Sequence, residues 1–278
     1  MSYTLTGFAG KVAVVTGAGR MRSIGRPIAL ALAQAGCDVV LTGTGRPVQS
    51  YPADEQEVNW RDIESVADEI RQLGRRALPL VSDVSKPEAV EALVARIVDE
   101  FGRVDFLVNN AGAARGGDRV PVTELSLDTW QRVMDVNLNG TFYMSRAFAK
   151  CMGEQGEGGA IINISSLAAQ LLAPDTSAYA TTKVAINGLT TIMARELGPK
   201  KIRVNVVAPG IIDTSRLDDV PRGQVWDEMV DAFIPLGRAG TGEDIAHLVA
   251  FLCSEQGAWI SGQTIYVDGG HCPTPRRN

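Results

Sequence analysis

Short apolar runs alternate with helix-like segments along nearly the whole chain, and this alternation constrains the fold more than any other feature. The first run, residues 12–16, ends at Gly17, and residues 24–35 then place apolar side chains on one helical face before Gly36. The same order repeats along the chain. We expect strands over residues 12–16, 38–42, 77–81, 104–108, 160–164, 203–207 and 264–267, and helices over 24–35, 62–73, 87–101, 127–152, 178–197 and 243–252.

Strands joined through helices pair in parallel, because each crossover returns the chain to the same end of the sheet. Strands this apolar have to be covered on both faces. The sequence therefore predicts the α/β class: a doubly wound, parallel, seven-stranded sheet of Rossmann type with helices on both faces. The chain has 278 residues, 45% of them hydrophobic, and no Pro-, Gly- or Ser-rich linker. We expect residues 1–278 to form a single domain.

The charge balance and the cysteine pattern exclude several classes of function. The net charge is -5 and no basic run could neutralise many phosphates, so we expect no nucleic-acid partner. No apolar stretch reaches the ~18 residues of a membrane-spanning helix, so we expect no membrane partner. The four cysteines lack CxxC spacing and there are two histidines, so no metal site is predicted. The N-terminal segment shows no signal-peptide pattern, and the expected location is cytoplasmic.

A glycine-rich segment stands between the first predicted strand and the first predicted helix. Gly17, Gly19 and Gly25 would let the backbone turn tightly and approach a pyrophosphate. The helix that starts near Ser23 and Ile24 would present free N–H groups and its positive dipole end to that anion. This segment predicts a dinucleotide-binding site.

The end of the second predicted strand would choose between NAD and NADP. An acidic residue there would bond the ribose hydroxyls and repel a 2′-phosphate. The sequence shows no Asp or Glu among residues 41–46, and it places Thr44 and Arg46 in the cofactor site. Arg46, with Arg20 or Arg22, could instead face a 2′-phosphate. This pattern favours NADP(H), with NAD(H) as the alternative.

Residues 43–61 make an unusually long connection between the second strand and the next helix. Two interpretations stay open. The segment is either a tolerated surface insertion near the cofactor end of the sheet, or it contacts the cofactor, the substrate or another subunit.

The sequence also places an acid–base group on one predicted helix. Tyr179 and Lys183 are four residues apart, so they lie on the same helical face. An ammonium near a phenol favours the phenolate and lowers the tyrosine pKa from its reference of about 10. Ser166 lies just past a strand end, where its hydroxyl could stabilise a developing alkoxide. Asn137 interrupts an apolar helix, where asparagine is normally disfavoured.

The ordered motifs along the chain resemble those of the short-chain dehydrogenases/reductases, over nearly the whole length. The motifs are the glycine-rich loop, Asn109-Asn110-Ala111-Gly112, Asn137, Ser166, the Tyr179/Lys183 pair, Pro209-Gly210, and the closing Ser261-Gly262-Gln263 and Asp268-Gly269-Gly270. The long helices over 127–152 and 178–197 commonly build a tetramer in this family, so the resemblance implies a homotetramer.

The resemblance also implies a role for each matched residue. Tyr179 would exchange a proton with the substrate oxygen, Lys183 would lower its pKa and bond the nicotinamide ribose, and Ser166 would polarise the carbonyl. Asn137 would hold a water that links Lys183 to a proton relay. The implied cofactor contacts are Asp83 and Val84 at the adenine, Asn110, Ala111 and Gly112 near the ribose, Pro209 and Gly210, and Ile212 and Thr214 at the carboxamide.

The chain departs from the family pattern in its glycine loop. Met21 and Arg22 lengthen the loop by two residues, and Ser23 stands where a glycine is usual. A lengthened loop resembles the enoyl reductases of the same superfamily. In that pattern, however, the Tyr and Lys stand six residues apart. The spacing of four in this chain favours carbonyl–alcohol chemistry over reduction of a C=C bond.

The implied activity is that of an NAD(P)-dependent oxidoreductase interconverting a secondary alcohol and a ketone by hydride transfer, as a ketone or 3-oxoacyl-type reductase acting on a small molecule. Residues 211–236 would form an amphipathic lid over an apolar or mixed substrate, or pack on the sheet. The alternative is a non-catalytic protein that binds the cofactor and senses its redox state. The intact set of Asn137, Ser166, Tyr179 and Lys183 argues against it, because a sensor needs no proton donor.

Overall fold

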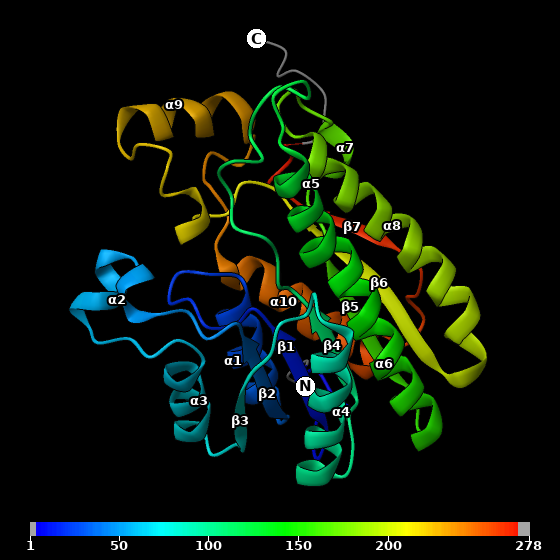
Figure 1. Cartoon of the computed structure of the whole chain (residues 1–278). Coiled ribbons are helices and arrows are strands. Elements are labelled where there is room, and N and C mark those ends of the chain that lie inside the picture. The colour runs from blue at the N-terminus through cyan, green and yellow to red at the C-terminus, as the bar shows by residue number, and fades with distance from the viewer. Residues whose placement is uncertain (1–3, 272–278) are drawn as a thin grey trace.

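Seven parallel strands form one sheet in the order β3-β2-β1-β4-β5-β6-β7 (Figure 1). The structure is a computed structural model and describes residues 4–271. The strands are β1 (Val12–Thr16), β2 (Asp38–Gly43), β3 (Ala77–Val81), β4 (Phe106–Asn109), β5 (Gly159–Ile164), β6 (Ile202–Pro209) and β7 (Thr264–Val267). The strand order reverses between β1 and β4, which pair at Ala13 and Phe106. Ligands of open α/β sheets bind beyond the carboxyl ends of the strands at such a reversal.

The helices connect these strands and cover the sheet. They are α1 (Gly25–Ala35), α2 (Ala53–Glu57), α3 (Ile63–Gln72), α4 (Pro87–Phe101), α5 (Leu127–Val133), α6 (Gly140–Gln155), α7 (Ala168–Leu171), α8 (Ser177–Leu197), α9 (Gln224–Phe233) and α10 (Gly242–Cys253). Short 3-10 or π turns are η1 (Val48–Ser50), η2 (Met134–Asn139), η3 (Gly198–Lys200), η4 (Ser215–Leu217) and η5 (Glu255–Gly257).

Side chains of each strand alternate between two cores, one on each face of the sheet. Along β1, Ala13 and Val15 pack into the core shared with α1, α3 and α10, whereas Val12 and Val14 pack into the core shared with α4, α6 and α8. This is the two-residue period of an extended strand. Because both faces of the strand are apolar, both have to be covered. The predicted doubly wound, seven-stranded fold is confirmed.

The predicted strands and helices agree with the structure to within about two residues at their ends, apart from the helix over 127–152. That helix is divided into α5, the π turn η2 and α6, which ends at Gln155. The π turn contains the buried Asn137. At Gly140 a Cβ would lie 2.7 Å from Cγ2 of Val84, so a larger residue would push the helix away. The interruption expected near Asn137 and Gly140 is therefore real.

The insertion over residues 43–61 folds against the glycine-rich loop. It contains η1 and α2, which Figure 1 shows beside the start of the chain's first helix. The backbone N–H of Met21 donates to Oε1 of Glu55 at 2.8 Å, and the indole N–H of Trp60 donates to the carbonyl of Gly19 at 2.6 Å. The segment is therefore not only a surface insertion, because it forms hydrogen bonds with the predicted cofactor loop.

The segment over residues 211–236 contains η4 and α9. In α9 Val230 is buried, but Val225 and Phe233 are each 53% exposed. Part of the apolar side of α9 therefore faces solvent.

Two composition-based expectations can be compared with the described part of the chain. No helix within residues 4–271 is both long and apolar enough to cross a membrane. Cys37, Cys151 and Cys253 are free thiols, and Cys272 lies outside the described residues.

Candidate active site

The carboxyl ends of four neighbouring strands meet at one edge of the sheet (Figure 1). Gly17 follows β1, Asn110 follows β4, Ser166 lies two residues after β5, and Gly210 follows β6. Helix α8 packs on β6 and on η2, and its first turn carries Tyr179. Segments far apart in the sequence therefore converge at the edge where a ligand is expected.

Tyr179, Lys183 and Ser166 lie together at this edge. Lys183 is buried, its Nζ donates to the carbonyl oxygen of Ile164 at 2.7 Å, and the same nitrogen lies 5.6 Å from the centre of the Tyr179 ring. The Ser166 hydroxyl, which accepts from the backbone N–H of Ala168 at 3.1 Å, lies close enough to the phenol of Tyr179 to lower its pKa. The helical spacing of four and the position past β5 thus produce the predicted cluster.

The electrostatics of the cluster favour the phenolate. Burial alone would raise the pKa of Tyr179, but the positive charges of Lys183 and Arg216, the neighbouring hydroxyl of Ser166 and the charge of Arg119 outweigh it, so the net pKa lies below its ordinary value. Burial lowers the pKa of Lys183, and the neighbouring Tyr179 opposes that effect. A phenol tuned in this way can give and take a proton closer to neutral pH.

Asn137 holds two segments of the site together. Its side-chain Oδ1 accepts from the backbone N–H of Ala113 at 2.8 Å, and its Nδ2 donates to Oγ1 of Thr182 at 3.2 Å. The hydroxyl of Thr141 donates to the Asn137 carbonyl at 2.7 Å. The amide therefore links the loop after β4 to the turn of α8 that carries Lys183.

The glycine-rich loop is packed on the end of β4. A Cβ on Gly17 would lie 2.8 Å from Cα of Ala111, and one on Gly25 would lie 2.6 Å from Nδ2 of Asn110. That amide donates to the carbonyls of Thr16 at 2.8 Å and Gly17 at 3.0 Å. The first turn of α1 contains no acidic side chain, so its positive end is available to an anion. These features fit a dinucleotide pyrophosphate.

The serine that stands in place of a glycine stabilises the lengthened turn. Ser23 donates from its hydroxyl to the carbonyl of Arg20 at 2.8 Å and accepts from the backbone N–H of Arg26 at 3.2 Å. Ile24, at the N-cap of α1, contributes no side-chain hydrogen bond. The longer loop is thus held by its own hydrogen bonds at the start of the helix.

A carboxylate from the segment after the insertion reaches the end of β2. A methyl group on Gly19 would overlap the carboxylate of Asp62, and a Cβ on Gly43 would lie 3.8 Å from its Oδ2. Arg46 donates to Glu55 at 3.2 Å and to Asp62 at 3.4 Å. Residues 41–46 contain no acidic side chain, but the fold places the carboxylate of Asp62 at the end of β2.

The other two arginines expected to face a 2′-phosphate also have partners. Arg22 donates to Asp54 at 2.7 Å and to Asp218 at 2.6 Å, and Arg20 donates to Oγ of Ser215 at 3.3 Å. Arg22 and Arg46 thus form ion pairs with Asp54, Glu55, Asp62 and Asp218, whereas Arg20 bonds the hydroxyl of Ser215. The positive charge on which the prediction of NADP(H) depended is therefore partly offset by carboxylates from residues 54–62 and from Asp218.

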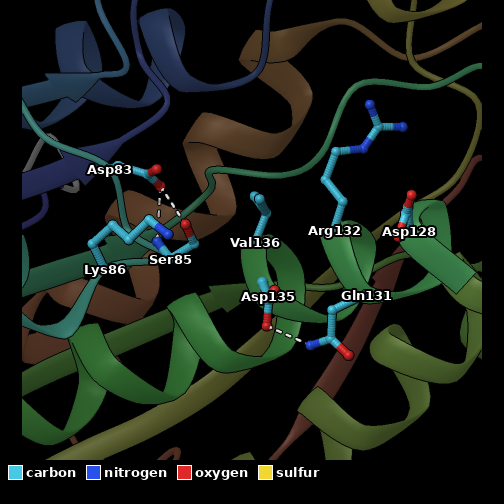
Figure 2. A pocket seen from close by; sticks show the side chains of 8 residues that line it. All are labelled: Asp83, Ser85, Lys86, Asp128, Gln131, Arg132, Asp135 and Val136. Carbon is cyan, nitrogen blue, oxygen red and sulfur yellow. Dashed lines mark hydrogen bonds between the residues drawn. The ribbon is translucent and has the colours of Figure 1, made fainter.

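The predicted adenine contacts, Asp83 and Val84, lie beside η2 and the start of α6. Asp83 accepts from the backbone N–H and hydroxyl of Ser85 at 2.9 Å and 2.8 Å, and Val84 packs on Gly140. Asp83 also lines an open surface pocket shown in Figure 2, which does not include Ser166, Tyr179 or Lys183. The pocket residues are Asp83, Ser85, Lys86, Asp128, Gln131, Arg132, Asp135 and Val136.

The remaining predicted contacts lie at the same edge of the sheet. Ile212 and Thr214 are buried in the segment that follows Pro209, and the N–H of Gly210 donates to the carbonyl of Val267 at 2.9 Å. Thr44 and Gly112 are exposed there, after β2 and β4.

Two arginines that the sequence did not single out stand over the ring of Tyr179. The guanidinium carbon of Arg119, in the loop after β4, lies 4.4 Å from the ring centre. That of Arg216, in η4, lies 5.2 Å from it. Both positions follow strand ends, where ligand contacts collect, but no spacing in the sequence connects either residue to Tyr179.

Known proteins resemble this chain over nearly its whole length. The profile of a family described as enoyl-(acyl carrier protein) reductase matches residues 17–271. A 2-dehydro-3-deoxy-D-gluconate 5-dehydrogenase of Escherichia coli (strain K12) is 37% identical over 266 residues, which are 94% of this chain and 95% of that protein. A 7alpha-hydroxysteroid dehydrogenase of the same strain is 36% identical over 261 residues, 94% of each chain.

A solved structure of a related dehydrogenase also matches this chain over nearly its whole length. A 7 alpha-hydroxysteroid dehydrogenase complexed with NADH and 7-oxo glycochenodeoxycholic acid superimposes with a TM-score of 0.83, at 35% identity and 97% coverage of both chains. Together with the sheet order and the Ser166, Tyr179 and Lys183 cluster, these matches show that the chain belongs to the short-chain dehydrogenase/reductase family. It is an NAD(P)-dependent oxidoreductase that acts on a CH–OH group or the corresponding carbonyl.

Proposed function

We propose that this enzyme interconverts a ketone and a secondary alcohol at the phenol of Tyr179. The observation that carries the proposal is the cluster itself. The Ser166 hydroxyl lies beside the phenol, Lys183 lies one helical turn away, and the pKa of Tyr179 is lowered. The four-residue Tyr–Lys spacing supports carbonyl chemistry, although the matching family profile is described as an enoyl reductase.

The side chains divide the proton chemistry among them. In the reducing direction the phenol O–H of Tyr179 gives its proton to the oxygen of the carbonyl as negative charge develops there, and in the oxidising direction the phenolate takes it back. The Ser166 hydroxyl donates to the same oxygen and stabilises its charge. The Lys183 ammonium, fixed by Ile164, holds the phenolate at low energy. A bound nicotinamide would supply or accept the hydride at the carbonyl carbon.

The fit of the nicotinamide cofactor rests on features of this chain. The backbone of Gly17 to Gly25 and the positive end of α1 would hold the pyrophosphate. Lys183 would bond the nicotinamide ribose, and Ile212 and Thr214 would hold the carboxamide. Asn110, Ala111 and Gly112 border the same path along the end of β4. Asn137 would support the proton relay by fixing the position of Lys183 through Thr182.

The charge balance at the adenosine ribose supports NAD(H). The sequence favoured NADP(H) because of Arg20, Arg22 and Arg46. A 2′-phosphate placed there would meet the carboxylate of Asp62 next to Gly19 and Gly43, and Arg22 and Arg46 already form ion pairs. Ribose hydroxyls, by contrast, can donate to that carboxylate. We therefore propose Asp62 as the residue that makes NAD(H) the preferred cofactor.

Two other expectations belong to this proposal. The enzyme would be a homotetramer built through α6 and α8, because Phe142, Val184 and Ile192 on these helices expose 44–56% of their surface. Residues 211–236 would close over the substrate. The narrower expectation of a 3-oxoacyl-type reductase and the cytoplasmic location stay predictions from the sequence.

A single assay tests the proposed function. Purified protein is mixed with NADH or NADPH and with a panel of aliphatic, aryl, cyclic, β-keto-ester and sugar-derived ketones, and the loss of the reduced cofactor is followed. Turnover of a ketone, faster with NADH, supports the proposal. Cofactor binding without turnover of any ketone would favour the redox-sensor alternative.

A further inference from the structure

The neighbourhood of Tyr179 holds more positive charge than its proton chemistry requires. Lys183, Arg119 and Arg216 place their charged groups 5.6 Å, 4.4 Å and 5.2 Å from the centre of the Tyr179 ring. Arg119 is accompanied by the carboxylate of Asp118, whose Oδ2 lies 3.8 Å from its Nε. Three cations therefore lie within 6 Å of one phenol ring.

Arg119 has unused hydrogen-bonding capacity. Its side chain is 21% exposed, its Nε is buried without a hydrogen-bond acceptor, and no side-chain hydrogen bond joins it to any residue of the described range 4–271. Burial lowers the pKa of Arg119, although nearby Asp118 and Tyr179 oppose that effect. A guanidinium has five N–H donors in a fixed plane. A buried donor without an acceptor destabilises the protein, and a ligand that accepts hydrogen bonds from these N–H groups would remove that cost.

Arg216 also lies over the ring of Tyr179, 5.2 Å from its centre. Its Nη1 donates to the carbonyl of Ala113 at 2.7 Å. No ion pair within residues 4–271 includes Arg216, and nearby Asp213 pairs with Arg222 instead. The neighbouring lid carboxylates are used elsewhere, because Asp218 pairs with Arg22 and Asp219 with Arg115. The two guanidinium groups thus come from different loops and meet over the catalytic phenol.

We propose that Arg119 and Arg216 bind a carboxylate of the substrate, so that the enzyme acts on a keto acid and its hydroxy acid. This inference rests on the proposed function, and it names the substrate class of that site. Because Asp118 already offsets part of the charge of Arg119, the pair suits a carboxylate monoanion better than a phosphate dianion. The carboxylate lies over one side of the Tyr179 ring while the carbonyl oxygen meets the phenol O–H and Ser166.

The experiment compares acids with their neutral esters. Levulinate, acetoacetate and oxocyclohexanecarboxylate, each with its methyl ester, are assayed with the wild type, Arg119→Met, Arg216→Met and the control Arg132→Met. Arg132 is exposed on α5 and lines the separate pocket of Figure 2, so its loss removes the same charge away from Tyr179. Circular dichroism and thermal unfolding confirm that each variant is folded.

The proposal gives distinct results for the two kinds of substrate. The wild type turns over acids with a higher kcat/KM than their esters, and Arg119→Met or Arg216→Met lowers kcat/KM for the acids about 10- to 100-fold and for the esters much less, with the change mainly in KM. If the arginines only tuned the pKa of Tyr179, acid and ester would change equally, because both use the same phenol. Equal changes, or a wild type that prefers the esters, would overturn the proposal.

A binding measurement separates this inference from the proposed function. Calorimetric titration of the same six compounds into the enzyme with NADH needs no turnover, and Tyr179→Phe serves as the inactive form. If no ketone is reduced, the proposed reaction fails. Tighter binding of acids than of esters, lost in Arg119→Met, would still support the carboxylate site. Absence of binding by all six, or equal binding of acid and ester, would overturn it.

Discussion

The indole N–H of Trp60 donates to the carbonyl oxygen of Gly19 at 2.6 Å, which fixes the end of the insertion to the cofactor loop. Two residues further on, the carboxylate of Asp62 lies against Gly19 and beside Gly43. The insertion is therefore what brings an acid to the ribose end of a strand that has none. If Asp62 binds the ribose as proposed, cofactor choice depends on a residue outside β2.

Asp62→Ala should shift the cofactor preference. Removal of the carboxylate leaves Arg46 paired with Glu55 alone and deletes an acceptor for the ribose hydroxyls. We expect the ratio of kcat/KM for NADH over NADPH to fall about 10-fold or more, since hydrogen bonds to charged groups contribute about 1.5–3 kcal/mol. Asp68→Ala, on the exposed part of α3, is the control. An unchanged ratio in Asp62→Ala would contradict the assignment.

The pH dependence should run in opposite senses for the two directions of reaction. Reduction needs the protonated phenol of Tyr179, so its kcat/KM falls as pH rises through the lowered pKa. Oxidation needs the phenolate and rises through the same pKa. Arg119→Met removes a positive charge that stabilises the phenolate, so both profiles should move to higher pH. Profiles that stay in place would show that Arg119 does not influence the phenol.

Asn137→Ala should destabilise the fold more than a neighbouring asparagine change. It leaves the buried N–H of Ala113 and the hydroxyl of Thr182 without this partner, and we expect the free energy of unfolding to drop by about 2–4 kcal/mol in urea titrations. Asn139→Ala, in the same π turn, loses a bond to the carboxylate of Asp135 and should cost about 1 kcal/mol or less. Equal losses would argue against the bridging role.

The assembly should be sensitive to charge on α8. Val184 and Ile192 are 45% and 56% exposed, and we expect them to be covered by another copy of the chain. Light scattering should give the mass of a tetramer for the wild type and a smaller species for Val184→Asp. A monomeric wild type would contradict the assembly.

The fold was readable from the sequence because each strand is a short apolar run that has to be buried on both faces. The catalytic cluster was readable for a related reason: a helix places Tyr179 and Lys183 on one face whatever surrounds them. Even the break in the helix over 127–152 could be located, because Asn137 is a poor helix residue among apolar neighbours.

What the sequence did not reveal depends on irregular backbone. Asp62 has a positive φ of 51° and reaches Gly19 only because residues 43–61 fold back over the loop. Arg119 and Arg216 belong to two loops that meet over Tyr179. No periodicity governs such segments, so neither the acid at the ribose nor the second pair of cations could be placed without coordinates.

The measurement that tests the central claim most directly compares Tyr179→Phe with the wild type in two assays, ketone turnover and NADH binding. The account predicts that kcat falls by about a thousandfold or more, because general acid catalysis contributes about 10²–10⁴-fold and the pKa-tuned phenol is its source. The Kd for NADH should change less than about threefold, since the phenol O–H adds little to cofactor affinity. A variant that keeps its turnover within about tenfold of the wild type would contradict the assignment of Tyr179 as the proton donor.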